Sequence, residues 1–121
     1  MLVVVALLAG CGGETSPPAA TPVAVDGYGR ELFDERVIGS IPGCVTCHSL
    51  EPGVTLVGPS LAEVTSPIPG VSTTDYVRES IVDPDAYLVD GFSAGQMTGG
   101  WDEYLSDEQI NSLVEFLLEA D

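Results

Sequence analysis

The residues with the most specific chemistry in the chain are Cys44, Cys47 and His48, which stand together in the segment CVTCH. Two thiols three positions apart can add to the two vinyl groups of one haem, and the adjacent histidine then falls beneath the iron as its proximal ligand. A redox dithiol would need a βαβ context that is missing. A structural zinc site would need four ligands, although only Cys11 and no second histidine remain. The segment therefore predicts one covalently attached c-type haem with its iron.

Met97 is the candidate for the second axial ligand of that iron. A lone methionine usually fills a core, but Met97 lies in the glycine-rich segment GQMTGG rather than on an apolar helix face. With His48 and Met97 both bound, the iron has no open position, which favours one-electron transfer over binding of a small-molecule substrate. His48 is also the only histidine, so a peroxidase-like mechanism lacks its distal acid–base group. These residues predict an electron carrier rather than an enzyme.

Three segments have the pattern of short helices that would hold these residues in place. They are residues 28–38 with Asp26 as the cap, residues 73–82 with Thr73 or Thr74 as the cap, and a last helix that starts with a Ser106–Gln109 capping box. Residues 49–72 contain four prolines, and a loop of that length in a small domain normally wraps something. No segment predicts a strand. We expect an all-α domain of three to five short helices, with long loops wrapped around one covalently bound haem.

The N-terminal residues predict export and a membrane anchor. Residues 1–10 are apolar and uncharged, too short to cross a bilayer and typical of a secretory signal. Their end resembles a bacterial lipobox, in which the chain is cut before Cys11 and this cysteine carries lipid; the alternative is an ordinary secretory signal that leaves Cys11 as a free thiol. Residues 11–26 then form a proline-rich tether, and the folded domain covers residues 27–121. We expect it on the extracytoplasmic face of a bacterial cytoplasmic membrane, or else soluble in the periplasm or secreted.

Charge narrows the choice of partners. The 121-residue chain suffices for one domain, and it holds three basic residues against nineteen acidic ones, a formal net charge of −16. Nucleic acids and anionic lipid surfaces attract clusters of Lys and Arg, so this charge argues against both. The acidic runs at residues 83–90, 102–108 and 115–121 are either solvated faces or a docking surface for a redox protein in the membrane with a basic patch.

From residue 27 to residue 118 the chain resembles a class I (mitochondrial-type) cytochrome c. In that family the haem motif follows the first helix, a G-P-x-L segment follows the motif, and a methionine ligand precedes the last helix. The corresponding residues here are the CVTCH segment, GPSL at residues 58–61, and Met97. The resemblance implies the cytochrome c fold, with haem bound by Cys44, Cys47, His48 and Met97. It also implies that the Pro59 carbonyl accepts a hydrogen bond from the second ring nitrogen of His48, which would orient the ring.

The resemblance extends to further residues around the haem. It implies a contact between the first and last helices that involves Gly29, Phe33 and Phe116. Four polar or aromatic side chains are candidates for hydrogen bonds to the haem propionates, with surface or core packing as the alternative for each: Tyr76, Arg78, Tyr87 and Trp101.

Two shorter runs, residues 76–84 and 89–92, look closest to bacterial membrane-associated monohaem cytochromes. Some of these serve quinol-oxidising complexes or haem-copper oxidases. The resemblance implies a lipid-tethered shuttle between a quinol-oxidising complex and a terminal oxidase or photosynthetic reaction centre. Two alternatives stay open. One is a permanently bound electron-relay subunit of a quinol-oxidising or oxidase complex, and the other is a haem enzyme or gas-binding protein with a labile Met97 ligand.

Overall fold

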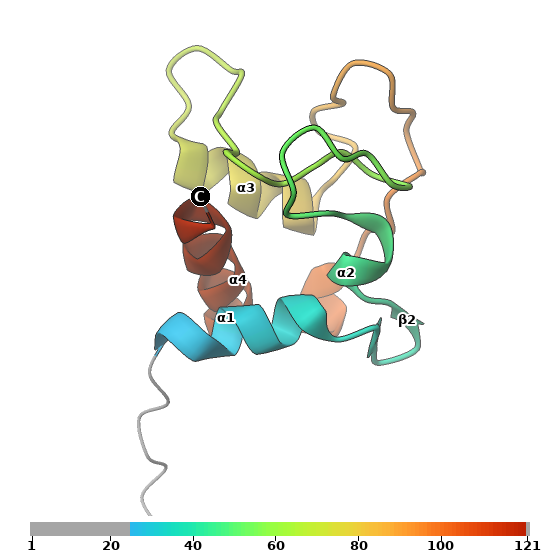
Figure 1. Cartoon of the computed structure of the whole chain (residues 1–121), viewed down its shortest axis with the longest axis vertical. Coiled ribbons are helices and arrows are strands. Elements are labelled where there is room, and N and C mark those ends of the chain that lie inside the picture. The colour runs from blue at the N-terminus through green and yellow to red at the C-terminus, as the bar shows by residue number, and fades with distance from the viewer. Residues whose placement is uncertain (1–24, 121) are drawn as a thin grey trace, which may run out of the picture.

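A computed structural model describes residues 25–120 of the chain, so the expected signal segment, Cys11 and residues 11–24 of the expected tether lie outside the described residues. The elements within the described part are α1 (Val25–Asp34), β1 (Val37–Ile38), β2 (Ile41–Pro42), α2 (Cys44–Cys47), α3 (Thr73–Val82), the 3-10 turn η1 (Trp101–Glu103) and α4 (Asp107–Glu119). Figure 1 shows α1 at the bottom of the domain, α3 above it, and the long loops after α2 and α3 in the upper part. The expected mainly helical domain with long loops is confirmed.

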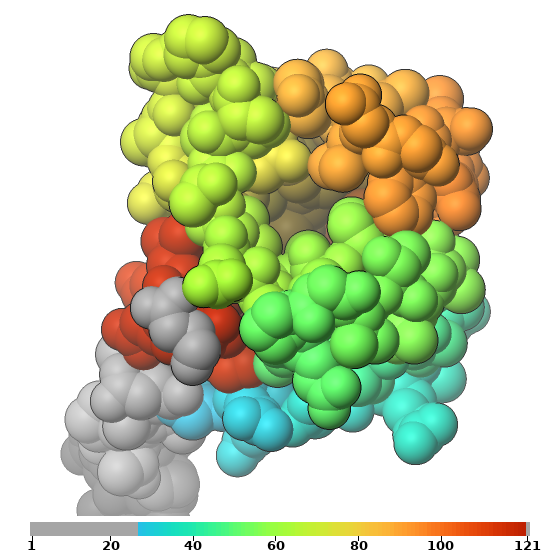
Figure 2. Space-filling view, turned by 45° about the horizontal axis from the view of Figure 1, so that its top comes forward, coloured from blue at the N-terminus to red at the C-terminus, as the bar shows by residue number. Residues whose placement is uncertain are grey.

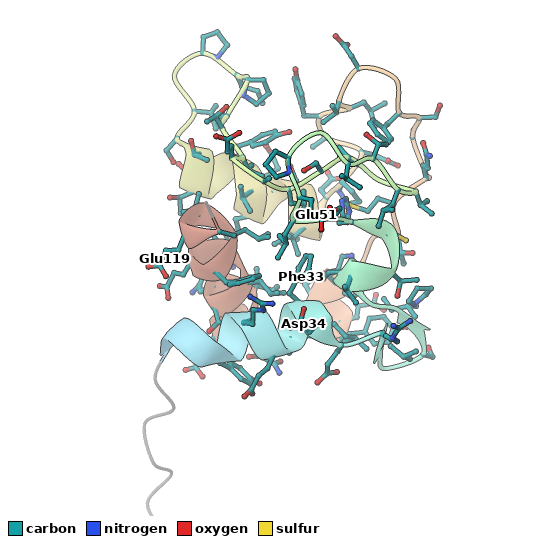
Figure 3. All side chains as sticks on the ribbon, in the orientation of Figure 1. Phe33, Asp34, Glu51 and Glu119 are labelled. Atoms are coloured by element: carbon teal, nitrogen blue, oxygen red, sulfur yellow. The ribbon has the colours of Figure 1, made fainter. Side chains whose placement is uncertain are left out.

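Helices α1 and α4 cross in close contact, and a glycine makes the contact possible. A methyl group on Gly29 would collide with the carbonyl of Ser112 and with Cβ of Phe116. One turn further along α1, the rings of Phe33 and Phe116 meet with their centroids 5.7 Å apart and tilted by 51°. The contact implied by the family resemblance is therefore present, and it places Phe33 so that its ring points from α1 into the interior (Figure 3).

The last helix forms as its sequence predicts. The hydroxyl of Ser106 accepts a hydrogen bond from the backbone N–H of Gln109, and the Gln109 side chain accepts one from the backbone of Ser106, so the capping box is complete. The apolar positions of one face are buried: Ile110, Leu113, Val114 and Leu117. This amphipathic face supplies the wall on which α1 and α3 pack.

The boundaries of α1 and α3 differ from those expected. Helix α1 begins at Val25, so Asp26 lies inside the first turn instead of capping it. Helix α3 is capped by the hydroxyl of Ser72, which accepts from the Asp75 N–H, rather than by Thr73 or Thr74. The helix ends at Val82 with Asp83 as its C-cap, as expected from the following proline. The start of α1 thus lies three residues before the expected one and the cap of α3 one residue before, because helix ends are less strictly encoded than helix interiors.

The expectation of a first helix through residue 38 and of no strand is wrong. Helix α1 ends at Asp34, and residues 37–38 pair with residues 41–42 in a two-stranded antiparallel hairpin. Val37 follows the helical period in sequence, but it is 61% exposed. The chain turns at Gly39, which has a φ of +62°, and Gly43 then packs against the carbonyl of Glu35. The hairpin brings α2 back beside the end of α1. In the described part of the chain, no helix combines the length and apolar character needed to span a membrane.

We predict that Gly29→Ala lowers the free energy of unfolding of the haem-bound protein by about 1–3 kcal/mol, because its methyl group must push α1 and α4 apart. The matched control is Gly27→Ala in the same helix, where a methyl group would meet nothing within 4 Å. This control should gain up to about 1 kcal/mol from the higher helix propensity of alanine. Denaturant unfolding followed by circular dichroism measures both variants, and equal effects would contradict the close helix contact.

Candidate functional site

The two thiols of the CVTCH segment lie at the two ends of the single turn α2, and both line the same cavity. They are free and partly buried. Three hydrogen bonds hold this turn in place: His48 N–H to the Cys44 carbonyl at 2.9 Å, Gly58 N–H to the Cys47 carbonyl at 2.8 Å, and the Thr46 hydroxyl to the Arg36 carbonyl at 3.1 Å. Burial raises the pKa of the Cys44 thiol, with the nearby Cys47 adding to the rise and a backbone hydrogen bond opposing it.

The His48 ring is fixed by a hydrogen bond and by a glycine. Its Nδ1 lies 2.9 Å from the carbonyl oxygen of Pro59; a carbonyl can only accept, so Nδ1 donates and Nε2 carries the lone pair. A methyl group on Gly58 would come within 3.0 Å of three ring atoms. His48 is 8% exposed, and burial lowers its pKa against the opposing effect of the Pro59 bond. With Nδ1 donating to Pro59, Nε2 is the ring nitrogen left to accept a bond from a ligand of the cavity.

The cavity beside these residues has a volume of about 520 Å³, within the usual range for a site that holds a small molecule or cofactor. Figure 2 shows the hollow between the loop after α2 and the loop after α3. Most of its wall is apolar, and the wall includes Phe33 from α1, Val77 and Ile81 from α3, and Leu113 and Leu117 from α4. This lining suits a large apolar ring.

Met97 reaches the same cavity from a different part of the chain. It lies in the segment of residues 84–99, which contains no helix or strand and which we call the methionine loop. Met97 is partly buried, packs against the hydrophobic core and lines the cavity together with His48. The fold thus brings the thioether and the imidazole, which are distant in sequence, to the wall of one cavity.

Trp101 provides a test of whether the cavity fits a haem. Its side chain is 3% exposed and lines the cavity. Among the residues that the structure describes, its Nε1 is the one buried side-chain polar atom that lacks a hydrogen-bond partner. Leaving such a donor unpaired costs about 1–3 kcal/mol. A carboxylate of a cavity ligand would accept from it, and haem carries propionates. With two thiols, an imidazole and a thioether lining the same cavity, the residues fit the group.

The other three candidates for propionate contacts differ from one another. Tyr76 and Tyr87 line the cavity, where their rings meet edge to face at 5.7 Å, and burial raises the pKa of Tyr76. Arg78 does not belong to the cavity wall. Its guanidinium donates to Asn111 and to Asp107, both at 2.6 Å, and so ties α3 to α4. These bonds agree with the alternative of surface packing for Arg78, and its contact with a propionate stays a prediction.

Two residues of the site were not expected from the sequence. The Gln96 side chain donates to the Val57 carbonyl at 3.2 Å, and the Asp85 carboxylate accepts from the Gly95 N–H at 2.9 Å. Both bonds hold the methionine loop. No local pattern marks them, because a single glutamine or aspartate in a loop has many possible partners until the fold selects one.

These features define an apolar cavity whose lining fits a haem. The family model for cytochrome c matches residues 28–121, and the chain belongs to the cytochrome c family. Its members bind covalent c-type haem with iron and carry electrons. None of the curated proteins compared with the chain matches it. The resemblance seen in the sequence and the mainly helical fold therefore agree with an independent match that covers the whole described domain.

We predict that Gly58→Ala displaces the His48 ring and weakens its bond to Pro59. In the reduced, haem-bound protein, exchange of the His48 Nδ1 proton with solvent, measured by NMR, should rise by up to about tenfold, since one hydrogen bond contributes about 0.5–1.5 kcal/mol. Gly99→Ala is the control, because its methyl group would make an ordinary contact with Pro84 at 3.7 Å. Equal exchange in wild type and Gly58→Ala would rule out the proposed fixing of the ring.

Proposed function

We propose that the chain is a one-electron carrier in which Cys44 and Cys47 hold the haem and His48 and Met97 are the axial ligands of its iron. One observation carries this proposal: the oriented imidazole of His48 and the thioether of Met97, which lies on a loop, line the same apolar cavity. The family supports a haem-based electron carrier. When bound, the haem supplies an iron that gains or loses one electron.

Pro59, the apolar wall and Trp101 each contribute to this function in a different way. The Pro59 carbonyl accepts the Nδ1 proton of His48, which keeps Nε2 free and raises its basicity as a ligand. The apolar wall excludes water and lowers the local dielectric constant. A low dielectric constant favours the oxidation state in which the haem carries the smaller net charge. Trp101 Nε1, which has no partner within the described residues, would donate to a carboxylate of the bound group. A site with two strong axial ligands and little water suits electron transfer and leaves no position for substrate.

Acidic side chains at the cavity wall support docking to a basic redox partner. Glu63, Asp85 and Asp90 belong to the wall, and among the described residues of the wall there is no arginine. Opposite charges raise the rate of encounter between two proteins. We propose that the partner is a membrane redox protein that presents positive charge to this face.

The N-terminal sequence supports a location beside such a partner. The apolar residues 1–10, the lipobox-like end before Cys11 and the proline-rich residues that follow support export and a lipid anchor on the extracytoplasmic face of a bacterial membrane. A tethered domain of this kind can shuttle between a quinol-oxidising complex and a terminal oxidase or photosynthetic reaction centre.

Ligation by Met97 predicts a specific spectroscopic result. The oxidised wild-type protein should show the charge-transfer band of an iron–methionine sulfur bond, and the reduced protein should bind CO slowly or not at all. Met97→Ala should abolish the band and allow rapid CO binding. In the control Met97→His, which supplies another strong ligand, the band should be absent but CO should still be excluded. A wild-type protein that binds CO as readily as Met97→Ala would instead support a gas-binding protein.

The charge of the cavity face predicts how electron transfer depends on salt. Reduction of the oxidised protein by hexaammineruthenium(II), a small cation, should slow as ionic strength rises, because salt screens the attraction. Asp90→Asn, at the cavity wall, should flatten this dependence, whereas Glu119→Gln at the end of α4, away from the cavity wall (Figure 3), should leave it unchanged. If the wild-type rate does not change with salt, the acidic residues do not attract the cation and are a solvated surface only.

A further inference from the structure

The two walls of the haem cavity are held by different kinds of bonds. On the His48 side, backbone hydrogen bonds run from Gly58 to Cys47 and from Leu61 to Ser49, both at 2.8 Å. In the methionine loop, the backbone bonds among the described residues are three short turns: Ala86 to Asp83, Phe92 to Val89 and Gln96 to Ser93. The backbone of this loop therefore shapes the loop itself but does not attach it to the rest of the domain.

Packing contributes to the attachment, as in the contact of Tyr87 with Tyr76 on α3, but within the described residues a single side chain supplies the hydrogen bond that joins the loop to the rest of the domain. The Gln96 Nε2 donates to the carbonyl of Val57 at 3.2 Å, and its Oε1 accepts from the Ser93 N–H at 3.1 Å. Within residues 25–120, this is the only side-chain hydrogen bond that links the methionine loop to another part of the chain. Gln96 directly precedes Met97, and Val57 directly precedes the Gly58-Pro59 pair that orients His48. The bond thus connects the two segments that carry the two sides of the site.

A second bond gives the loop its shape. The Asp85 carboxylate accepts from the Gly95 N–H at 2.9 and 3.2 Å, and Gly95 has a φ of +74°, which only glycine adopts without strain. This bond joins the start of the methionine loop to the residues beside Met97. When the Gln96 bond breaks, the loop can therefore move as one piece rather than unravel.

We propose that Gln96 is a positioning residue that holds Met97 at the iron through its hydrogen bond to Val57, and that breaking this bond is the step by which Met97 leaves. The inference rests on the proposed ligation by Met97. Gln96 is exposed, so water competes for both of its hydrogen bonds. The loop therefore opens more readily than the helical core unfolds.

The test compares three variants of the full haem-bound protein. Gln96→Leu removes both side-chain bonds at similar size, and Gln96→Lys keeps a donor that can reach the Val57 carbonyl. Ser93→Ala is the matched control, because the backbone N–H of Ser93, not its hydroxyl, bonds to Gln96. For each protein we would measure three quantities: the rate of CO binding to the reduced form, the temperature at which the oxidised form loses the iron–sulfur band, and the temperature of unfolding by circular dichroism.

Gln96→Leu should bind CO roughly three- to tenfold faster, since the loss of one hydrogen bond shifts the opening equilibrium by about that factor. It should lose the band at a lower temperature while its unfolding temperature stays that of the wild type. Gln96→Lys and Ser93→Ala should behave like the wild type.

Three outcomes would overturn the proposal, and they are distinguishable. A Gln96→Leu variant with wild-type CO binding and band would show that the Gln96 bond does not hold Met97. A band and an unfolding temperature that fall together would make Gln96 a general stabilising residue. A wild type without the band would refute the ligation by Met97 itself, and with it this inference.

Discussion

The space between the helices is the constraint on which the rest of the structure depends. It measures about 520 Å³, and Phe33 and Leu113, the side chains that would otherwise fill a small core, form its wall instead. Most of its wall is apolar, so a large apolar ring that occupies the space removes this surface from water. The bound haem is therefore the centre of the core as well as the redox group.

The elements around this space divide into a rigid part and a part that can move. Helices α1 and α4 meet with no room for a methyl group at Gly29. The hairpin of β1 and β2 fixes the position of α2, which carries the two thiols. The His48 side is attached by backbone bonds. The methionine loop is attached by packing, as between Tyr87 and Tyr76, and by the hydrogen bond of the exposed Gln96 side chain. An electron carrier needs surroundings that change little between its two oxidation states, and most of this domain meets that need through backbone and close packing.

The features that the sequence predicted are those whose causes are local or covalent. The spacing of Cys44 and Cys47 follows from haem chemistry, and the Ser106–Gln109 capping box needs only one helical turn. The sequence does not reveal the hairpin at residues 37–42 because Val37 fits the helical period of α1. Its conformation depends instead on the contact of Gly39 with the ring of Tyr104, far along the chain, and on the close approach of Gly43 to the Glu35 carbonyl. The bonds of Arg78 and Gln96 likewise join residues far apart in sequence, and no short pattern encodes such partners.

Iron X-ray absorption spectroscopy on the oxidised, haem-bound protein tests the central claim most directly, because it detects the atoms bound to the metal. The account predicts one sulfur and one histidine nitrogen in addition to the porphyrin nitrogens, and the sulfur should disappear in Met97→Ala. A first shell of nitrogen and oxygen only in the wild type would contradict it, since the cavity would then hold a haem whose second axial position is not closed by Met97.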